Sequence, residues 1–79
     1  MPNHALISAE LSERIAALIG ERDELTMYAL ANVWSELRGE RVREQMLYNY
    51  RAKRLIRCNG AGRVDRDEAI AFLAKKLAK

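Results

Sequence analysis

Polar side chains that can bind a polyanion are concentrated in the middle of this 79-residue chain. Between positions 41 and 63 they are Arg41, Arg43, Gln45, Tyr48, Asn49, Arg51, Lys53, Arg57 and Arg63. Arginine and lysine bind phosphate oxygens, and arginine, glutamine and asparagine can hydrogen-bond the edges of guanine or adenine. These residue types and their clustering predict non-covalent binding of a nucleic acid. All nine residues are predicted to contact it.

The distribution of charge also favours a polyanionic partner. Residues 38 to 66 hold nine basic and three acidic residues, whereas the rest of the chain holds five basic and eight acidic residues. All but one of the cations in this basic segment are arginines, whose planar guanidinium matches phosphates and guanine edges. The formal net charge is only +3, so the asymmetry of the charge carries the prediction.

Catalysis, metal binding and cofactor binding are not expected. The chain has one cysteine, Cys58, and one histidine, His4, which cannot form an internal disulfide or a zinc site. No serine stands in a motif with a base that would activate it. No apolar run has the length of a membrane span, and the N-terminus lacks the features of a signal peptide. We therefore expect a non-enzymatic protein of the cytoplasm that makes no membrane contact.

Two helices are expected before the basic segment. Ser8 can cap a first helix over residues 8 to 20, which presents one apolar face formed by Leu11, Ile15, Leu18 and Ile19. That face either covers the protein's own core or pairs with a second copy. Thr26 can cap a second helix that begins near Met27 and stops at Gly39, with Trp34 at the centre of the core.

A third helix is expected from about Arg43 to Arg54. Its inward face is Met46, Leu47 and Tyr50. Its outward face is then Glu44, Gln45, Tyr48, Asn49, Arg51 and Ala52. A helix with this outward face has the width and the side chains to enter the major groove of DNA.

A short β-hairpin is expected after the third helix. Residues 55 to 58 alternate like a strand, Asn59-Gly60 is a strong two-residue turn signal, and residues 63 to 64 would form the returning strand. Asp65 can then cap a last helix. The order of elements predicts a mostly α, winged helix-turn-helix fold with flanking N- and C-terminal helices. It forms one domain over residues 1 to 79, with a flexible segment 1 to 7 and a winged core over 25 to 78.

Within this fold each contact residue has an expected role. Gln45, Asn49 and Arg51 would contact bases, with Arg43 at the start of the helix. Tyr48 would donate to a phosphate. The hairpin residues Arg57 and Arg63 would reach a neighbouring backbone or the minor groove.

The chain resembles MerR-like DNA-binding domains and the related phage excisionases over about residues 25 to 74. The resemblance lies in Met46-Leu47-Tyr48-Asn49-Tyr50, then Leu55-Ile56, then Gly62-Arg63-Val64 and Asp67-Glu68-Ala69. It implies that Leu47 and Tyr50 are buried and that Tyr48 and Asn49 face DNA. It implies a transcriptional regulator or a recombination accessory factor. A small accessory protein of the excisionase or phage-regulator kind is favoured over a ligand-sensing activator.

Three features depart from that family. Arg54 stands where glycine is common, the segment between the two helices of the motif is longer than the usual tight turn, and the first helix is outside the pattern. A domain of this size offers few phosphate contacts, so a homodimer, cooperative assembly on DNA, or a protein partner such as a recombinase or polymerase is expected to help. The rival function is a protein-interaction module, for instance a phage or toxin-antitoxin adaptor whose basic face docks on an acidic protein. RNA binding is a lesser alternative.

Overall fold

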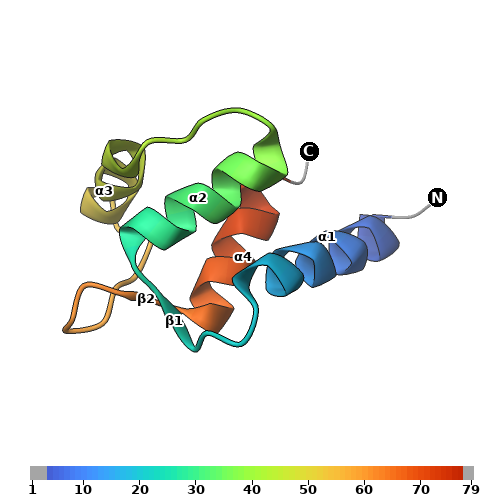
Figure 1. Cartoon of the computed structure of the whole chain (residues 1–79), viewed down its shortest axis with the longest axis horizontal. Coiled ribbons are helices and arrows are strands. Elements are labelled where there is room, and N and C mark those ends of the chain that lie inside the picture. The colour runs from blue at the N-terminus through green and yellow to red at the C-terminus, as the bar shows by residue number, and fades with distance from the viewer. Residues whose placement is uncertain (1–3, 78–79) are drawn as a thin grey trace.

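The computed structural model describes residues 4 to 77 of the chain. The elements in order are α1 (His4–Ile19), β1 (Glu24–Leu25), α2 (Met27–Arg38), α3 (Glu44–Ala52), β2 (Val64–Asp65) and α4 (Arg66–Leu77) (Figure 1). The structure is therefore mostly helical, as predicted, with four helices and one two-stranded sheet in the described residues. In this part of the chain no helix has the length and apolar character needed to cross a membrane.

The helices surround one apolar core. α4 lies behind α2 and packs against both α1 and α2, and α3 packs against α2 (Figure 1). The side chain of Trp34 is 4% exposed and lies at the centre, with its ring 6.0 Å from that of Tyr50 and 5.4 Å from that of Phe72. These three rings join α2, α3 and α4, so the position of α3 depends on this cluster. No polar side chain among the described residues is buried.

The boundaries of α2 confirm the sequence prediction. The side chain of Thr26 accepts a hydrogen bond of 3.0 Å from the backbone N–H of Ala29, as an N-cap does. α2 begins at Met27 and ends before Gly39, whose φ of 78° is in the left-handed region that ends helices.

α1 differs from its prediction in two respects. It begins at His4 and not at Ser8, while residues 1 to 3 lie outside the described part. Ile15 and Ile19 are buried, whereas Leu18 is 41% exposed. Leu18 is turned by about 100° around the helix from Ile19, which places it beside the face that contacts the core. The buried residues confirm that this face covers the protein's own core.

Arg66 joins the end of α1 to the start of α4. Its guanidinium donates hydrogen bonds to the backbone carbonyl oxygens of Gly20 and Arg22, the second at 3.1 Å. A guanidinium nitrogen also lies 3.5 Å from the carbonyl oxygen of Ala16. Its backbone N–H donates to the carbonyl of Asp23 at 2.8 Å. Gly20 and Arg22 follow the last residue of α1, so Arg66 ties the segment after α1 to the start of α4.

The predicted β-hairpin is wrong. Residues 55 to 58 form no strand, and β2 pairs antiparallel with β1, so that Leu25 lies opposite Val64. Leu25 and Val64 are 1% and 0% exposed, which shows that this pairing places both side chains in the core. An isolated two-stranded hairpin would bury little apolar surface and is marginal in water. Residues 53 to 63 therefore form a loop and not a hairpin.

α3 ends in a Schellman arrangement, at Ala52 and not at the expected Arg54. The backbone N–H of Leu55 donates to the carbonyl of Tyr50, and that of Arg54 donates to the carbonyl of Arg51, both at 2.9 Å. This arrangement needs a left-handed residue, and Arg54 adopts it with φ of 63°. Arg54 is also the residue that stands where the resembled family commonly has glycine.

The Arg54→Gly substitution is expected to raise the free energy of unfolding by about 0.5 to 1 kcal/mol, because a left-handed non-glycine residue costs about 1 kcal/mol or more and part of the gain is offset by chain entropy. Urea denaturation followed by circular dichroism measures the change. The control is Lys53→Gly at φ of −86°, where glycine gives no relief of strain and should destabilise the protein. An Arg54→Gly protein less stable than the original would contradict this interpretation.

Candidate nucleic-acid interface

The turn between α2 and α3 fixes where α3 begins. The hydroxyl oxygen of Ser35 accepts a hydrogen bond of 2.8 Å from the backbone N–H of Val42 and donates one of 2.8 Å to the carbonyl of Ala31. Val42 is itself buried, at 5% exposure. The segment between α2 and α3 is thus tied to α2 at Val42, just before α3 begins. α3 therefore has a defined orientation on the core.

α3 has the two faces that the sequence predicts. Leu47 is fully buried, and Met46 and Tyr50 are half-buried against the core. The outward residues are all exposed, namely Glu44, Gln45, Tyr48, Asn49, Arg51 and Ala52. Gln45, Tyr48, Asn49 and Ala52 are spaced at i, i+3, i+4 and i+7, so they form the middle of the exposed stripe.

Two side-chain amides lie together on this stripe. The Nε2 atom of Gln45 donates to Oδ1 of Asn49 at 3.3 Å. Each amide can donate and accept at once, which is the property needed to match the N6 and N7 atoms of adenine. The pair is exposed, so both amides can exchange their mutual hydrogen bond for one to a ligand.

Cations lie at both ends of α3. Arg41 and Arg43 precede the helix and Lys53 follows it, and all three are exposed. Arg51 is exposed on the last turn of α3, and Arg57 is exposed in the loop that follows. Along the longest axis of the molecule, α3 and the loop occupy one end and the start of α1 occupies the other (Figure 1). The contact residues predicted on α3 and on the loop after it therefore lie at one end of the molecule, whereas Arg41 lies on the segment that runs from the end of α2 to α3.

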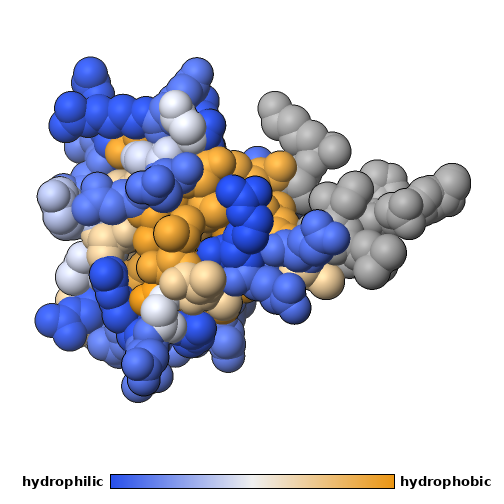
Figure 2. Space-filling model, turned by 45° about the vertical axis from the view of Figure 1, so that its right-hand side comes forward, coloured by the Kyte–Doolittle hydropathy of each residue, from blue (hydrophilic) through white to orange (hydrophobic). Residues whose placement is uncertain are grey.

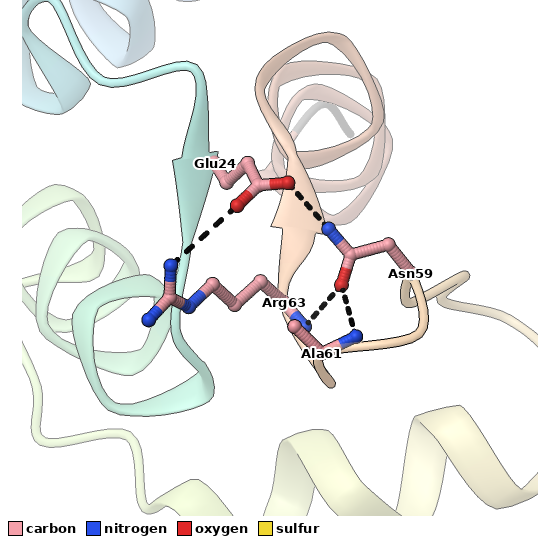
Figure 3. A network of polar contacts seen from close by, with 4 residues as sticks. All are labelled: Glu24, Asn59, Ala61 and Arg63. Atoms are coloured by element: carbon pink, nitrogen blue, oxygen red, sulfur yellow. Dashed lines mark hydrogen bonds and ion pairs between the residues drawn. The ribbon is translucent and has the colours of Figure 1, made fainter.

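The loop from residue 53 to residue 63 is closed by Asn59. Its backbone N–H donates to the carbonyl of Arg63 at 2.8 Å, and its side-chain oxygen accepts from the backbone N–H groups of Ala61 at 2.9 Å and Arg63 at 3.1 Å (Figure 3). The backbone N–H of Gly62 donates to the carbonyl of Asn59 at 2.9 Å. The Asn-Gly signal thus does form a turn, although no strands flank it.

Glu24 on β1 ties this loop to the rest of the molecule. One carboxylate oxygen accepts from the side-chain amide of Asn59, and the other lies 3.6 Å from a guanidinium nitrogen of Arg63 (Figure 3). Both partners of the ion pair are partly exposed, at 40% for Glu24 and 55% for Arg63. Arg63 is therefore the one predicted contact residue that the structure shows in an ion pair.

The described residues contain no group of three or more histidine, cysteine, aspartate or glutamate side chains that could hold a metal ion. Cys58 is a free, half-buried thiol beside the core. No protein-family model, no curated protein and no solved structure matches the chain. A function must accordingly be inferred from the arrangement of the side chains.

Sequence reasoning missed the structural roles of Ser35, Glu24 and Arg66. Ser35 and Glu24 position the candidate surface, whereas Arg66 joins the end of α1 to the start of α4. Each of them contacts a residue that is distant in the sequence or in another element. Only for Ser35 was there a local signal, since serine within a helix often bonds the carbonyl four residues earlier.

Proposed function

We propose that this protein binds duplex DNA through α3, as a small regulator of transcription or an accessory factor of site-specific recombination. The observation that carries the proposal is the exposed face of α3, on which the Gln45–Asn49 amide pair lies between cations at both ends of the helix. Its orientation on α2 is fixed by Ser35 and by the aromatic cluster. The fold would then be a helix-turn-helix in which α3 is the recognition helix and the Asn59 loop replaces the hairpin wing.

The dimensions of α3 suit the major groove. Its 9 residues extend over about 13 Å, and a helix is narrow enough for a groove about 12 Å wide. Gln45, Asn49 and Arg51 would contact base edges, with Arg43 at the helix start. Tyr48, Arg41 and Lys53 would bind phosphates on either side. Arg57 on the loop would reach a neighbouring phosphate.

The proposal is tested by fluorescence anisotropy of a labelled random-sequence duplex at salt concentrations between about 50 and 200 mM. The logarithm of the affinity should fall linearly with the logarithm of the salt concentration, with a slope near −0.9 for each phosphate contacted. A duplex of RNA with the same sequence is the control, since its deep, narrow major groove excludes an α-helix. No binding to DNA at the lowest salt would overturn the proposal and leave the basic surface for an acidic protein partner.

Glu24→Gln is expected to tighten binding to the same duplex by about two- to fivefold, in keeping with the modest strength of exposed ion pairs. Glutamine keeps an oxygen that can accept from Asn59, but it removes the carboxylate that pairs with Arg63. The loop would keep its shape while the guanidinium becomes available to a phosphate. The measurement is the same anisotropy titration.

Asp23→Asn is the matched control for this variant. It removes an exposed carboxylate at the adjacent position, whose side chain makes no contact with Asn59 or Arg63 among those the structure describes. An equal gain for both variants would mean that only the total charge matters, and the role given to the Glu24–Arg63 pair would be wrong.

A further inference from the structure

A hollow lies where α2 meets the chain that leads into α3. It has a volume of about 310 Å³ and is lined by Tyr28 and Asn32 of α2 and by Arg41, Arg43 and Glu44 around the start of α3. We call this the α2–α3 hollow. The first turn of α2 lies at the same end of the molecule as α3 (Figure 1). Arg41 and Arg43 were predicted from the sequence to contact DNA, whereas Tyr28 and Asn32 were not.

The backbone around the hollow is held in one arrangement. Ser35 and Val42 also line it, and the hydroxyl oxygen of Ser35 accepts the hydrogen bond of 2.8 Å from the backbone N–H of Val42. Val42 is buried and stands between Arg41 and Arg43 in the sequence. The two arginines are therefore carried by backbone that is tied to α2, and a ligand would not have to order this backbone when it binds.

The hollow offers hydrogen-bond donors that the fold does not use. Tyr28 is 64% exposed, and Asn32, Arg41 and Arg43 are exposed as well. Among the described residues, none of these four side chains makes a hydrogen bond or an ion pair. A tyrosine hydroxyl, an asparagine amide and two guanidinium groups can all donate. The hollow therefore fits a ligand group with several acceptor oxygens.

The charge of the hollow favours an anion. The guanidinium groups of Arg41 and Arg43 outnumber the one carboxylate, that of Glu44, which lies in the first turn of α3 and stabilises the helix there. No ion pair joins Glu44 to either arginine among the described side chains. Figure 2 shows mostly hydrophilic residues over the left end of the molecule, which carries α3, and hydrophobic residues nearer its middle. A phosphate group has both the negative charge and the acceptor oxygens that this hollow fits.

We propose that the α2–α3 hollow binds one phosphate group of the DNA backbone, to which Tyr28 and Asn32 of α2 donate hydrogen bonds beside Arg41. This site rests on the proposed function, because backbone phosphates border the major groove in which α3 would lie. Phosphate contacts fix the register and orientation of a protein on the duplex. α2 would thus belong to the DNA surface and hold the start of α3 at one position along the backbone.

Two single variants measure what α2 contributes in the anisotropy titration with the labelled duplex. Tyr28→Phe removes only a hydroxyl group and should weaken binding about two- to tenfold, the usual effect of one hydrogen bond. Asn32→Asp places a carboxylate in the hollow and should weaken binding at least about tenfold, because it repels the phosphate. Both side chains are exposed, so the helical circular dichroism spectrum should not change.

Each variant has a matched control outside the hollow. Tyr50→Phe removes a hydroxyl group that makes no hydrogen bond among the described contacts, and it should leave affinity unchanged. Lys75→Gln lowers the net charge by one, as Asn32→Asp does, but on the exposed surface of α4. It should change affinity less than about twofold, since a distant exposed charge is screened by salt.

Replacement of single phosphates by uncharged methylphosphonates locates the contact. The duplex is one that the unaltered protein selects from a random pool, and each phosphate is replaced in turn. One replacement should weaken binding of the unaltered protein at least about fivefold but weaken Tyr28→Phe and Asn32→Asp less than about twofold, because these variants have already lost that contact. Replacement of the other contacted phosphates should weaken all three proteins alike.

The outcomes separate this site from the proposed function. Duplex binding that Tyr28→Phe and Asn32→Asp leave unchanged would overturn the phosphate site alone, and so would variants that respond to every methylphosphonate as the unaltered protein does. Absence of duplex binding by the unaltered protein would overturn the proposed function and this site with it. A single phosphate whose replacement no longer matters to the two α2 variants would establish the contact.

Discussion

Replacing Arg43, Asn49 and Arg51 together by alanine is expected to lower the affinity for duplex DNA at least about 100-fold, since each bidentate contact to a base is worth about 1 to 3 kcal/mol. Arg43 and Arg51 lie at the start and in the last turn of α3, and Asn49 lies on the exposed stripe between them. All three side chains are exposed, so the fold should not change. Fluorescence anisotropy with a labelled duplex measures the loss.

The control for this variant removes cations from a different part of the surface. Arg14 and Lys75 are exposed on α1 and α4, and their replacement by alanine should reduce affinity far less. The midpoint of urea denaturation should be close to that of the unaltered protein for both variants. If the α3 variant bound duplex DNA as tightly as the unaltered protein, α3 would not be the recognition helix.

Trp34→Ala is expected to lower the free energy of unfolding by about 3 to 5 kcal/mol, the usual cost of truncating a buried tryptophan. The ring of Trp34 is 4% exposed and contacts Tyr50 of α3 and Phe72 of α4. Small domains have total stabilities near the lower end of about 5 to 15 kcal/mol, so a large part of the variant population should be unfolded at 37 °C. Urea denaturation followed by circular dichroism measures the change.

Tyr48→Ala is the comparison for the tryptophan variant. Tyr48 is 42% exposed on α3, and its truncation should change stability by only about 0.5 kcal/mol. If Trp34→Ala were as mild as Tyr48→Ala, the aromatic cluster would not be what holds α3 on the core. In that case, any loss of DNA binding by the Trp34→Ala protein would need an explanation other than the displacement of α3.

The elements that the sequence predicts well are those whose signals are local. Thr26 caps α2 through an N–H three residues away, Gly39 ends it, and the apolar spacing of Leu47 and Tyr50 sets the inward face of α3. In each case the residues that decide the structure lie within one or two turns of each other. The exposed face of α3, and with it most of the candidate site, follows from that spacing.

The features that were predicted wrongly depend on distant contacts. Asn59-Gly60 is a strong hairpin signal, but the strand after it pairs with β1, because that pairing buries Leu25 and Val64 together. No pattern near residue 60 specifies a partner near residue 25. The restraint of Arg63 by Glu24 could not be predicted for the same reason. A smaller error concerns Leu18, which was predicted on the apolar face of the first helix but is exposed to water.

The pairing of β1 with β2 has a consequence for the order in which the protein folds. Leu25 and Val64, which lie opposite each other, are 39 positions apart, and the segment between them contains α2, α3 and the Asn59 loop. Closing a segment of this length costs more chain entropy than forming a helix, so α2 and α3 should form before the two strands meet. The loop with Arg57 and Arg63, which lies between the two strands in the sequence, would then gain its shape after α2 and α3.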